Sequence, residues 1–453
     1  MAEVIAAIAT GTAPCAIGIL RLSGDGCAEV AGRCFALKSG QPLTAAPNRR
    51  LVMGTLFDAQ GRVIDQALAV YTRAPHTYTG EDTVELQCHG SPAVLRAGLD
   101  ALFRAGARQA RAGEFTKRSF LNGQMDLTGA EAVVDLIDAE TADAAANAAA
   151  QVGGALFRRL DPIYQNLTDL CSHYHAVLDY PDEDIPDFRL ADFRTTLERD
   201  LEALRQLDES CERGRILKNG VRVALLGRPN VGKSSLLNAL AGFDRVIVTP
   251  IPGTTRDTVE ERISLGGLPV RLIDTAGIRD SGDMVEALGV DRSLAAAKQA
   301  DLALLLADAA EPLTEEDFRA IEAAKAARHA AAVLSKSDLP AVLSPEDLPF
   351  ETVLSVSAVT GEGLDALSDY IRGLFASDRP CDGSILTNAR QQEAVRRAMQ
   401  ALSEALAAMQ LGITPDAVLL EIEAAMEAIG ELTGKTARED ITQRIFARFC
   451  VGK

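Results

Sequence analysis

The sequence predicts a multidomain protein with a mixed α/β N-terminal part, an all-α part and a third part built on a mostly parallel, doubly wound sheet. Three observations lead to this prediction. Strand and helix patterns alternate from 221 to about 375, which is typical of a parallel sheet with helices on both faces. Apolar residues recur three and four positions apart over 127–217 and 390–449, as in amphipathic helices. Short apolar or alternating runs, separated by Gly and Pro, fill the first 120 residues.

The composition is that of an acidic chain. It has 453 residues and a formal net charge of −18, which repels nucleic acid. An RNA contact therefore needs a local basic patch, and Arg104, Arg108, Arg111, Lys117 and Arg118 either form one or are only a solvated surface. No apolar run is long enough for a membrane span, the start of the chain lacks the basic residues of a signal peptide, and the eight cysteines include no C-x-x-C pair. We therefore expect a cytoplasmic protein without a membrane contact.

In the N-terminal part, strands are expected at 17–22, 51–57, 67–71 and 84–88. Each is a short apolar or alternating run bounded by turn residues. A helix is expected at 91–105. This pattern predicts a mixed α/β domain.

Two helical stretches flank the parallel α/β part, and neither is a complete core by itself. The acidic run 180–187 interrupts the first stretch; we interpret it as a solvated helix–helix connection, with a metal site as the minor alternative. The simplest architecture has one discontinuous helical domain of residues 121–216 and 376–453. An N-terminal domain of residues 1–120 precedes it, and the α/β domain, residues 217–375, is inserted within it.

Residues 227–234 read GRPNVGKS, a complete phosphate-binding loop. The loop follows the apolar run 221–226 and precedes the helix-compatible stretch 235–240, and this strand–loop–helix context is what the chemistry requires. Its glycines let successive N–H groups and a helix N-terminus point at phosphates. Lys233 is expected to reach the terminal phosphates and Ser234 to bind Mg²⁺.

Further motifs follow in the order that a guanine-nucleotide switch protein needs. Thr255, in the Gly/Pro-rich segment 253–257, is expected to complete the Mg²⁺ shell. Asp274, which ends the apolar run 270–273, is expected to hold Mg²⁺ through water, and the N–H of Gly277 to bind the γ-phosphate.

Base recognition is expected after the two strands predicted at 331–334 and 353–356. Asp338 accepts from two donors of guanine, which selects guanine over adenine, and the Ser357-Ala358 pair offers a backbone N–H to its O6. Because both lie at carboxyl ends of strands, where such sheets bind ligands, the set predicts an inserted Ras-like P-loop GTPase domain. A P-loop protein for ATP with chance matches is the alternative.

The catalytic machinery departs from that of Ras-like proteins, which place a Gln where this chain has Ile278. Glu286 is the best candidate to orient water; an exposed helix carboxylate is the other interpretation. Asn230 could coordinate a monovalent cation beside the phosphates, or only shape the loop. Arg256 and Arg279 are rival charge stabilisers, or they only organise the switch loops.

From end to end, the chain closely resembles the bacterial tRNA-modification GTPase family MnmE, also called TrmE. The segments that carry the resemblance outside the nucleotide motifs are ILR at 19–21, YTGED at 78–82, ELQCHG at 85–90, GEFTKR at 113–118, FLNG at 120–123 and FCVGK at 449–453. The resemblance implies an N-terminal domain that dimerises and binds folate, a helical domain and a G domain.

The resemblance also implies the function. Such proteins hydrolyse GTP when their G domains dimerise with K⁺. They act with the FAD-dependent partner MnmG, as a homodimer within a heterotetramer or larger assembly, and tRNA is bound through this complex. The assembly installs a C5 aminomethyl-type group, carboxymethylaminomethyl, on wobble uridine 34 of certain tRNAs. The implied cofactors are K⁺, Mg²⁺, the substrate GTP, and 5-formyl-tetrahydrofolate or a related one-carbon tetrahydrofolate.

Carried over residue by residue, the resemblance assigns five groups of site residues. The catalytic candidates are Glu286, Lys233, Asp274, Arg256 and Cys450. The K⁺ positions are Asn230, Thr249, Ile251 and Thr254, and the Mg²⁺ positions are Ser234 and Thr255. The folate positions are Arg21, Glu85, Gln124 and Lys453. The GTP-binding residues are Asn230, Val231, Gly232, Lys233, Ser234, Ser235, Thr249, Pro250, Ile251, Pro252, Gly253, Thr254, Thr255, Asp274, Thr275, Ala276, Gly277, Ser335, Lys336, Ser337, Asp338, Ser357, Ala358 and Val359.

Three positions depart from the family pattern. Ser335 replaces the usual Asn, which predicts weaker nucleotide binding because Ser lacks a two-ended amide. Gln124 replaces a Lys, which removes a positive partner for folate carboxylates. Residues 10–16 replace a Pro/Gly/Arg-rich loop. Two further roles stay open: Cys450 is a nucleophile or proton donor, or only a buried end residue, and His89 is more readily explained by packing or hydrogen bonding.

Two competing functions are also open. One is a binding switch, such as a ribosome-assembly GTPase, although such proteins normally carry a basic RNA-binding module. The other is a scaffold that binds GTP without turnover, which the identities of Ile278 and Ser335 raise.

Overall fold

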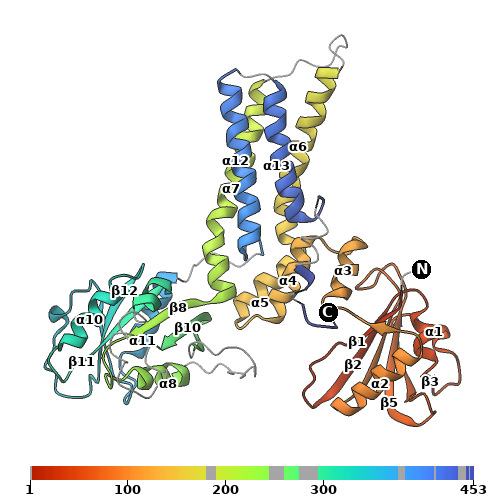
Figure 1. Ribbon diagram of the computed structural model, residues 1–453, viewed down its shortest axis with the longest axis horizontal. Helices are drawn as coiled ribbons and strands as arrows, with labels where there is room; N and C mark the ends of the chain where they lie inside the picture. The colour runs from red at the N-terminus through yellow and green to blue at the C-terminus, as the bar shows by residue number, and fades with distance from the viewer. Residues whose placement is uncertain are drawn as a thin grey trace. The chain divides into compact units, whose positions relative to one another are not determined.

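The computed structural model describes residues 3–179, 190–243, 260–274, 294–375, 383–412, 415–436, 445–447 and 449–452 (Figure 1). The chain forms two compact units. The first contains Met1–Val134, Ala149–Leu204 and Glu393–Lys453, and the second contains Asp135–Ala148 and Arg205–Gln392. The helical segments are divided between these units, and the domain boundaries expected from the sequence stay predictions.

The N-terminal part of the first unit is a seven-stranded sheet with the strand order β3-β4-β5-β6-β2-β1-β7. Its neighbouring strands are antiparallel except for the parallel pair β1 and β7. The strands are β1 Ile5–Ile8, β2 Cys15–Ser23, β3 Phe35–Leu37, β4 Leu51–Phe57, β5 Val63–Thr72, β6 Thr83–Gly90 and β7 Arg108–Gln109. The four expected strands are confirmed as β2, β4, β5 and β6. The other three have two to four residues, too few to show a period of two.

One face of this sheet is covered by α1 (Cys27–Gly32) and α2 (Pro92–Arg104), which confirms the helix expected at 91–105. Alternate strand residues such as Leu20 and Leu86 pack against Leu95 and Leu102 of α2 in one core. The intervening residues lie on the opposite face, because successive side chains of a strand point to opposite sides. Arg21 on β2 and Glu85 on β6 are therefore side by side on that opposite face.

From residue 127 onward the described part of the first unit is mainly helical, as expected, whereas the helix α3 (Glu114–Leu121) was not predicted. The helices that contribute to it are α3 Glu114–Leu121, α4 Leu127–Ile137, α5 Ala142–Val152, α6 Ala155–Asp179, α7 Leu190–Asn219, α12 Ala389–Gln410 and α13 Pro415–Thr433. Helices α6 and α13 run side by side (Figure 1), with Cys171 Sγ 3.5 Å from Met426 Sδ, and Asn166 of α6 donates to Asp200 of α7 at 3.0 Å. The expected packing of the two helical flanks against each other is thus confirmed within this unit. The acidic run 180–187 lies outside the described residues.

The second unit contains a six-stranded sheet with the order β13-β12-β11-β8-β10-β9, in which only β9 is antiparallel to its neighbour. The strands are β8 Val221–Leu226, β9 Glu260–Leu265, β10 Leu268–Asp274, β11 Leu302–Asp308, β12 Ala330–Ser335 and β13 Val353–Val356. This confirms the mostly parallel sheet that the sequence predicts.

Helices cover both faces of this sheet. On one face, α8 (Lys233–Phe243) and α11 (Leu364–Phe375) pack on Val223 and Leu225 of β8. On the other face, α10 (Glu315–Ala324) packs on Ala224 and Leu226. The sheet is therefore doubly wound, and the loops that follow its strands are at one edge. Within the described part of the chain, no helix has the length and apolar character needed to span a membrane.

Candidate nucleotide-binding site

The phosphate loop connects the buried strand β8 to α8, as expected. Gly227 (φ 143°) and Gly232 (φ 99°) adopt conformations that favour glycine, and Asn230 is left-handed at φ 63°. A Cβ on Gly227 would lie 2.5 Å from the carbonyl oxygen of Leu306, so only glycine lets the loop approach β11 this closely. The loop therefore has a strained backbone that its surroundings must hold in place.

Lys233 lies inside this loop. Its ammonium group donates to the carbonyl oxygens of Gly227 and, at 2.8 Å, of Arg228, and its side chain is buried. Ser234, next along α8, is exposed. A lysine that bridges the loop from within and a hydroxyl at the helix N-terminus fit the expected phosphate and Mg²⁺ roles.

Base recognition is organised around the ends of β12 and β13. The hydroxyl of Ser357 donates to Asp338 Oδ1 at 2.6 Å and accepts from the amides of Val359 and Thr360. This fixes the orientation of the Asp338 carboxylate and leaves its second oxygen for a base. The structure thus brings together the two motifs that the sequence predicts to read guanine.

Ser335 begins the loop 335–338 at the end of β12, here called the base loop, and it connects this loop to the phosphate loop. Its buried hydroxyl lies 2.6 Å from the carbonyl oxygen of Val231, to which it donates, and 3.1 Å from that of Ala307. A serine therefore keeps a contact with the phosphate loop, although it has no amide group to reach the base as well.

These loops surround one cavity of about 210 Å³. The residues that line it are Gly232, Ser235, Leu236, Val333, Ser335, Lys336, Asp338, Leu339, Val356, Ala358 and Val359. The phosphate loop and both base motifs meet here, at the carboxyl ends of parallel strands. Apolar walls and one aligned carboxylate suit a planar base with hydrogen-bond donors.

Sequence reasoning missed a contact beside this cavity. Asp308, the last residue of β11, accepts from Lys336 Nζ at 2.5 Å and is buried. Burial alone would raise the pKa of Asp308, but the Lys336 ammonium and the Ala310 amide hold it below its usual value. The available signal was a carboxylate at the end of the uniformly apolar run 302–307.

Much of the predicted site lies outside the described residues. This applies to the side chain of Asp274 and to Thr249, Pro250, Ile251, Pro252, Gly253, Thr254, Thr255, Arg256, Thr275, Ala276, Gly277, Ile278, Arg279, Glu286 and Lys453. Their expected roles stay predictions.

A second cluster of predicted residues lies on the face of the N-terminal sheet that is opposite α1 and α2. Arg21 Nε donates to Glu85 Oε1 at 2.8 Å. The guanidinium carbon lies 5.9 Å from the ring centre of Tyr78 and 5.8 Å from that of Phe115, so two aromatic rings border it. Tyr78, which sequence reasoning did not select, is 39% exposed and shares a 2.9 Å hydrogen bond with Thr116.

Gln124 belongs to the same region. A Cβ on Gly80, in the loop that carries Tyr78, would lie 3.2 Å from Gln124 Nε2. Asn122 holds this loop by donating to the Thr79 carbonyl at 2.7 Å. The structure thus places Arg21, Glu85 and Gln124 around one loop.

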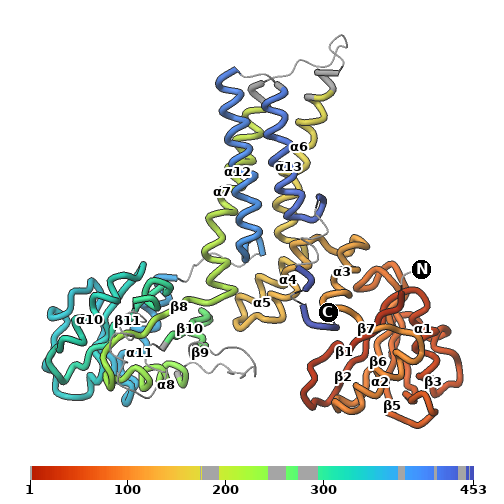
Figure 2. The backbone as a smooth tube through the Cα atoms, in the orientation of Figure 1, coloured from red at the N-terminus to blue at the C-terminus, as the bar shows by residue number. Residues whose placement is uncertain are grey.

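The C-terminal tail returns to this N-terminal part (Figure 2). Val451 forms an antiparallel bridge with Ala112, and the Gly113 amide donates to the Cys450 carbonyl at 3.4 Å. Cys450 is exposed, which removes the interpretation of a buried end residue. Its chemical role stays a prediction.

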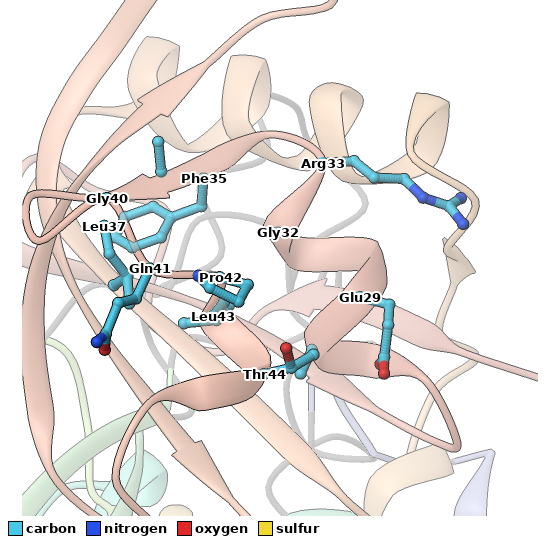
Figure 3. Close-up of a pocket in the computed structure, with 12 residues that line it drawn as sticks. Glu29, Gly32, Arg33, Phe35, Leu37, Gly40, Gln41, Pro42, Leu43 and Thr44 are labelled. Atoms are coloured by element: carbon cyan, nitrogen blue, oxygen red, sulfur yellow. The ribbon is translucent and has the colours of Figure 1, made fainter.

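Two other features of the N-terminal part, a cavity and His89, are not assigned as functional sites. A larger cavity of about 510 Å³ lies between α1 and the turn at Leu43–Ala45, where Glu29, Arg33 and Gln41 surround it (Figure 3), but no motif residue lines it. His89 is oriented by Asp65, whose Oδ1 is 2.8 Å from Nδ1, which agrees with a hydrogen-bonding role.

The basic cluster is smaller in the structure than in the sequence. Arg108 pairs with Glu3 and Glu114, and Arg118 with Glu81 and Glu114. Two of its five cations are therefore neutralised locally.

A guanine-reading cavity beside a phosphate loop, on a doubly wound sheet, defines a P-loop GTPase. Two family profiles match the chain: the MnmE helical domain over residues 127–450 and the N-terminus of the GTP-binding protein TrmE over residues 4–124. The chain belongs to the MnmE family of tRNA modification GTPases.

Relatives with this name match the chain over its whole length. The protein of Symbiobacterium thermophilum is 44% identical over 100% of this chain and 99% of its own length. That of Roseiflexus sp. is 42% identical with the same coverage. That of Aquifex aeolicus is 39% identical over 100% of both chains.

Proposed function

We propose that this chain hydrolyses GTP as part of an assembly that installs a carboxymethylaminomethyl-type group on C5 of wobble uridine 34 of certain tRNAs. The observation that carries the proposal is the meeting of the phosphate loop and both guanine motifs at one cavity, in a chain that matches tRNA modification GTPases end to end. We further propose that this reaction takes place in the cytoplasm and that MnmG is the FAD-dependent partner.

In the GTPase reaction, Asp338 selects guanine and Lys233 neutralises the terminal phosphates. Magnesium would be held by the exposed Ser234 and by Thr255, since hydroxyl oxygens are suitable ligands for this hard cation, and it would neutralise charge on the phosphate oxygens. Glu286 orients the attacking water in place of the Gln that Ile278 replaces.

Potassium would be held in part by Asn230. Its side chain is exposed, and its left-handed backbone fixes the loop at this position. An amide oxygen is a suitable ligand for a weakly hydrated monovalent cation beside the phosphates. The remaining proposed ligands are Thr249, Ile251 and Thr254. Joining of two G domains around this cation stimulates hydrolysis.

The face of the N-terminal sheet opposite α1 and α2 is the proposed site for a one-carbon tetrahydrofolate such as 5-formyl-tetrahydrofolate. The Nε of Arg21 is engaged by Glu85, which leaves its two terminal nitrogens for a ligand carboxylate. The second oxygen of Glu85 can accept from the donor edge of a pterin. The ring of Tyr78 offers a surface for an aromatic ligand, and Gln124 and Lys453 complete the proposed set.

The proposed active form is a homodimer. The N-terminal domains hold the two chains together, and MnmG completes a heterotetramer or larger assembly that binds tRNA. The formal charge of −18 suggests that the partner supplies much of the basic surface for the tRNA.

Analysis of wobble nucleosides in a deletion strain tests the function. We expect unmodified uridine 34 in the deletion strain, and we expect the parent gene to restore the modification. Intact modification together with defective ribosomal subunits would instead support the ribosome-assembly alternative. GTPase assays in KCl and NaCl test the mechanism: absence of stimulation by KCl would exclude K⁺-dependent hydrolysis.

A further inference from the structure

The carboxyl end of β11 supports both nucleotide-binding loops. Gly227 of the phosphate loop is packed against the carbonyl oxygen of Leu306. Two residues later, Asp308 accepts a hydrogen bond from Lys336 of the base loop. The residues that connect β11 to α10 are therefore in a position to hold the site.

Arg228 connects the phosphate loop to this segment. Its guanidinium forms an ion pair with Glu311, and its Nε lies 3.5 Å from Asp317 Oδ2. Asp317 is itself fixed, because it is the third residue of α10 and forms a capping box with Thr314. Arg228 does not line the 210 Å³ cavity, so its side chain is not a base ligand.

The two loop cations hold the phosphate loop in different ways. Lys233 bridges loop carbonyls from inside, but it is expected to exchange these for phosphates when nucleotide binds. Arg228 instead pairs with Glu311, in the connection between β11 and α10, and this ion pair does not compete with phosphate. It therefore remains available to hold the strained backbone around Asn230 in the bound state.

We propose that Arg228 is a positioning residue that sets how long nucleotide stays bound, by tying the phosphate loop to Glu311 in the β11–α10 connection. The inference rests on nucleotide binding only, and not on the tRNA or folate parts of the proposed function. Since the pair is partly exposed, with Glu311 56% exposed, its loss is expected to speed GDP release about two- to fivefold.

The test is a double-mutant cycle on the release of fluorescently labelled GDP from the full chain, chased with excess GDP. The variants are Arg228→Ala, Glu311→Gln and both together. Each single change is expected to speed release, and the double variant to release GDP no faster than the quicker single one. Arg228→Lys is expected to restore part of the parent behaviour.

Arg319→Ala is the matched control, since Arg319 pairs with Glu315 at 3.9 Å in an exposed ion pair on α10, the helix that follows Glu311. Its GDP release is expected to equal that of the parent. The proposal is overturned if Glu311→Gln releases GDP at the parent rate, or if the two single effects simply multiply. Because Glu311 is exposed, this variant keeps the test decisive should Arg228→Ala fail to fold. A parent chain that binds no GDP would contradict the GTPase assignment itself.

Discussion

Replacing Ser335 by Asn is expected to tighten GDP binding. The serine hydroxyl already donates to the phosphate loop at Val231, but it ends there. An Asn side chain carries a carboxamide in place of the hydroxyl and therefore reaches further toward the cavity that Ser335 lines. Its amide could contact the loop at one end and the base at the other.

The expected gain is one hydrogen bond. A net contribution of about 1 kcal/mol corresponds to roughly fivefold tighter binding. Ser335→Ala should act in the opposite direction, because it leaves the Val231 carbonyl without this donor. Titration of fluorescent GDP by anisotropy, checked by calorimetry, measures both changes.

The control is Ser355→Asn, the same replacement on an exposed position of the neighbouring strand β13. It should bind GDP like the parent. If Ser335→Asn binds GDP no more tightly than the parent, the account of this position is wrong.

Three further predictions follow from the two sites. Glu286→Ala should lower the turnover of GTP about 10²- to 10⁴-fold while GDP affinity is kept; parent-like turnover in a single-turnover assay would remove it from the reaction. Arg21→Ala should weaken binding of a reduced folate at least about tenfold by calorimetry, with unchanged GDP affinity showing that the chain is folded. Burial by itself would raise the pKa of Glu114, but Arg108 and the amide of Arg111 lower it to about 2. The stabilisation that ionised Glu114 gives the folded chain is therefore complete above about pH 4.5 and is lost as the pH falls toward 2. Glu114→Gln should therefore reduce the free energy of unfolding at pH 7 by about 2 kcal/mol, and this difference should shrink below pH 4 in urea titrations; a constant difference would contradict the assigned pKa.

The strands of the second unit were predictable because parallel strands buried on both faces are nearly continuous apolar runs. The run expected at 353–356 has these bounds in the structure, and that at 331–334 is one residue shorter at each end than β12. In the N-terminal sheet, β4 was also predicted with its observed bounds. Strand β1 was missed because four residues of Ile and Ala carry no helix or strand period.

The candidate site was predictable where the chemistry is local. The phosphate loop acts through consecutive backbone groups, so its sequence is sufficient to identify it. The partners of Arg228 and Lys336 could not be identified in this way. Glu311 and Asp308 are more than 25 positions away in sequence and are brought close only by the pairing of β8 and β12 with β11.

The sequence by itself determined the class of nucleotide, the order of the motifs and the family, because these depend on residue types at fixed spacing. The tertiary structure decided which charges are already paired. Arg108 and Arg118 read as members of a basic patch, yet they are bound to Glu3, Glu81 and Glu114. Strand register and helix packing choose such partners, and both are set by the burial of apolar faces over long sequence separations.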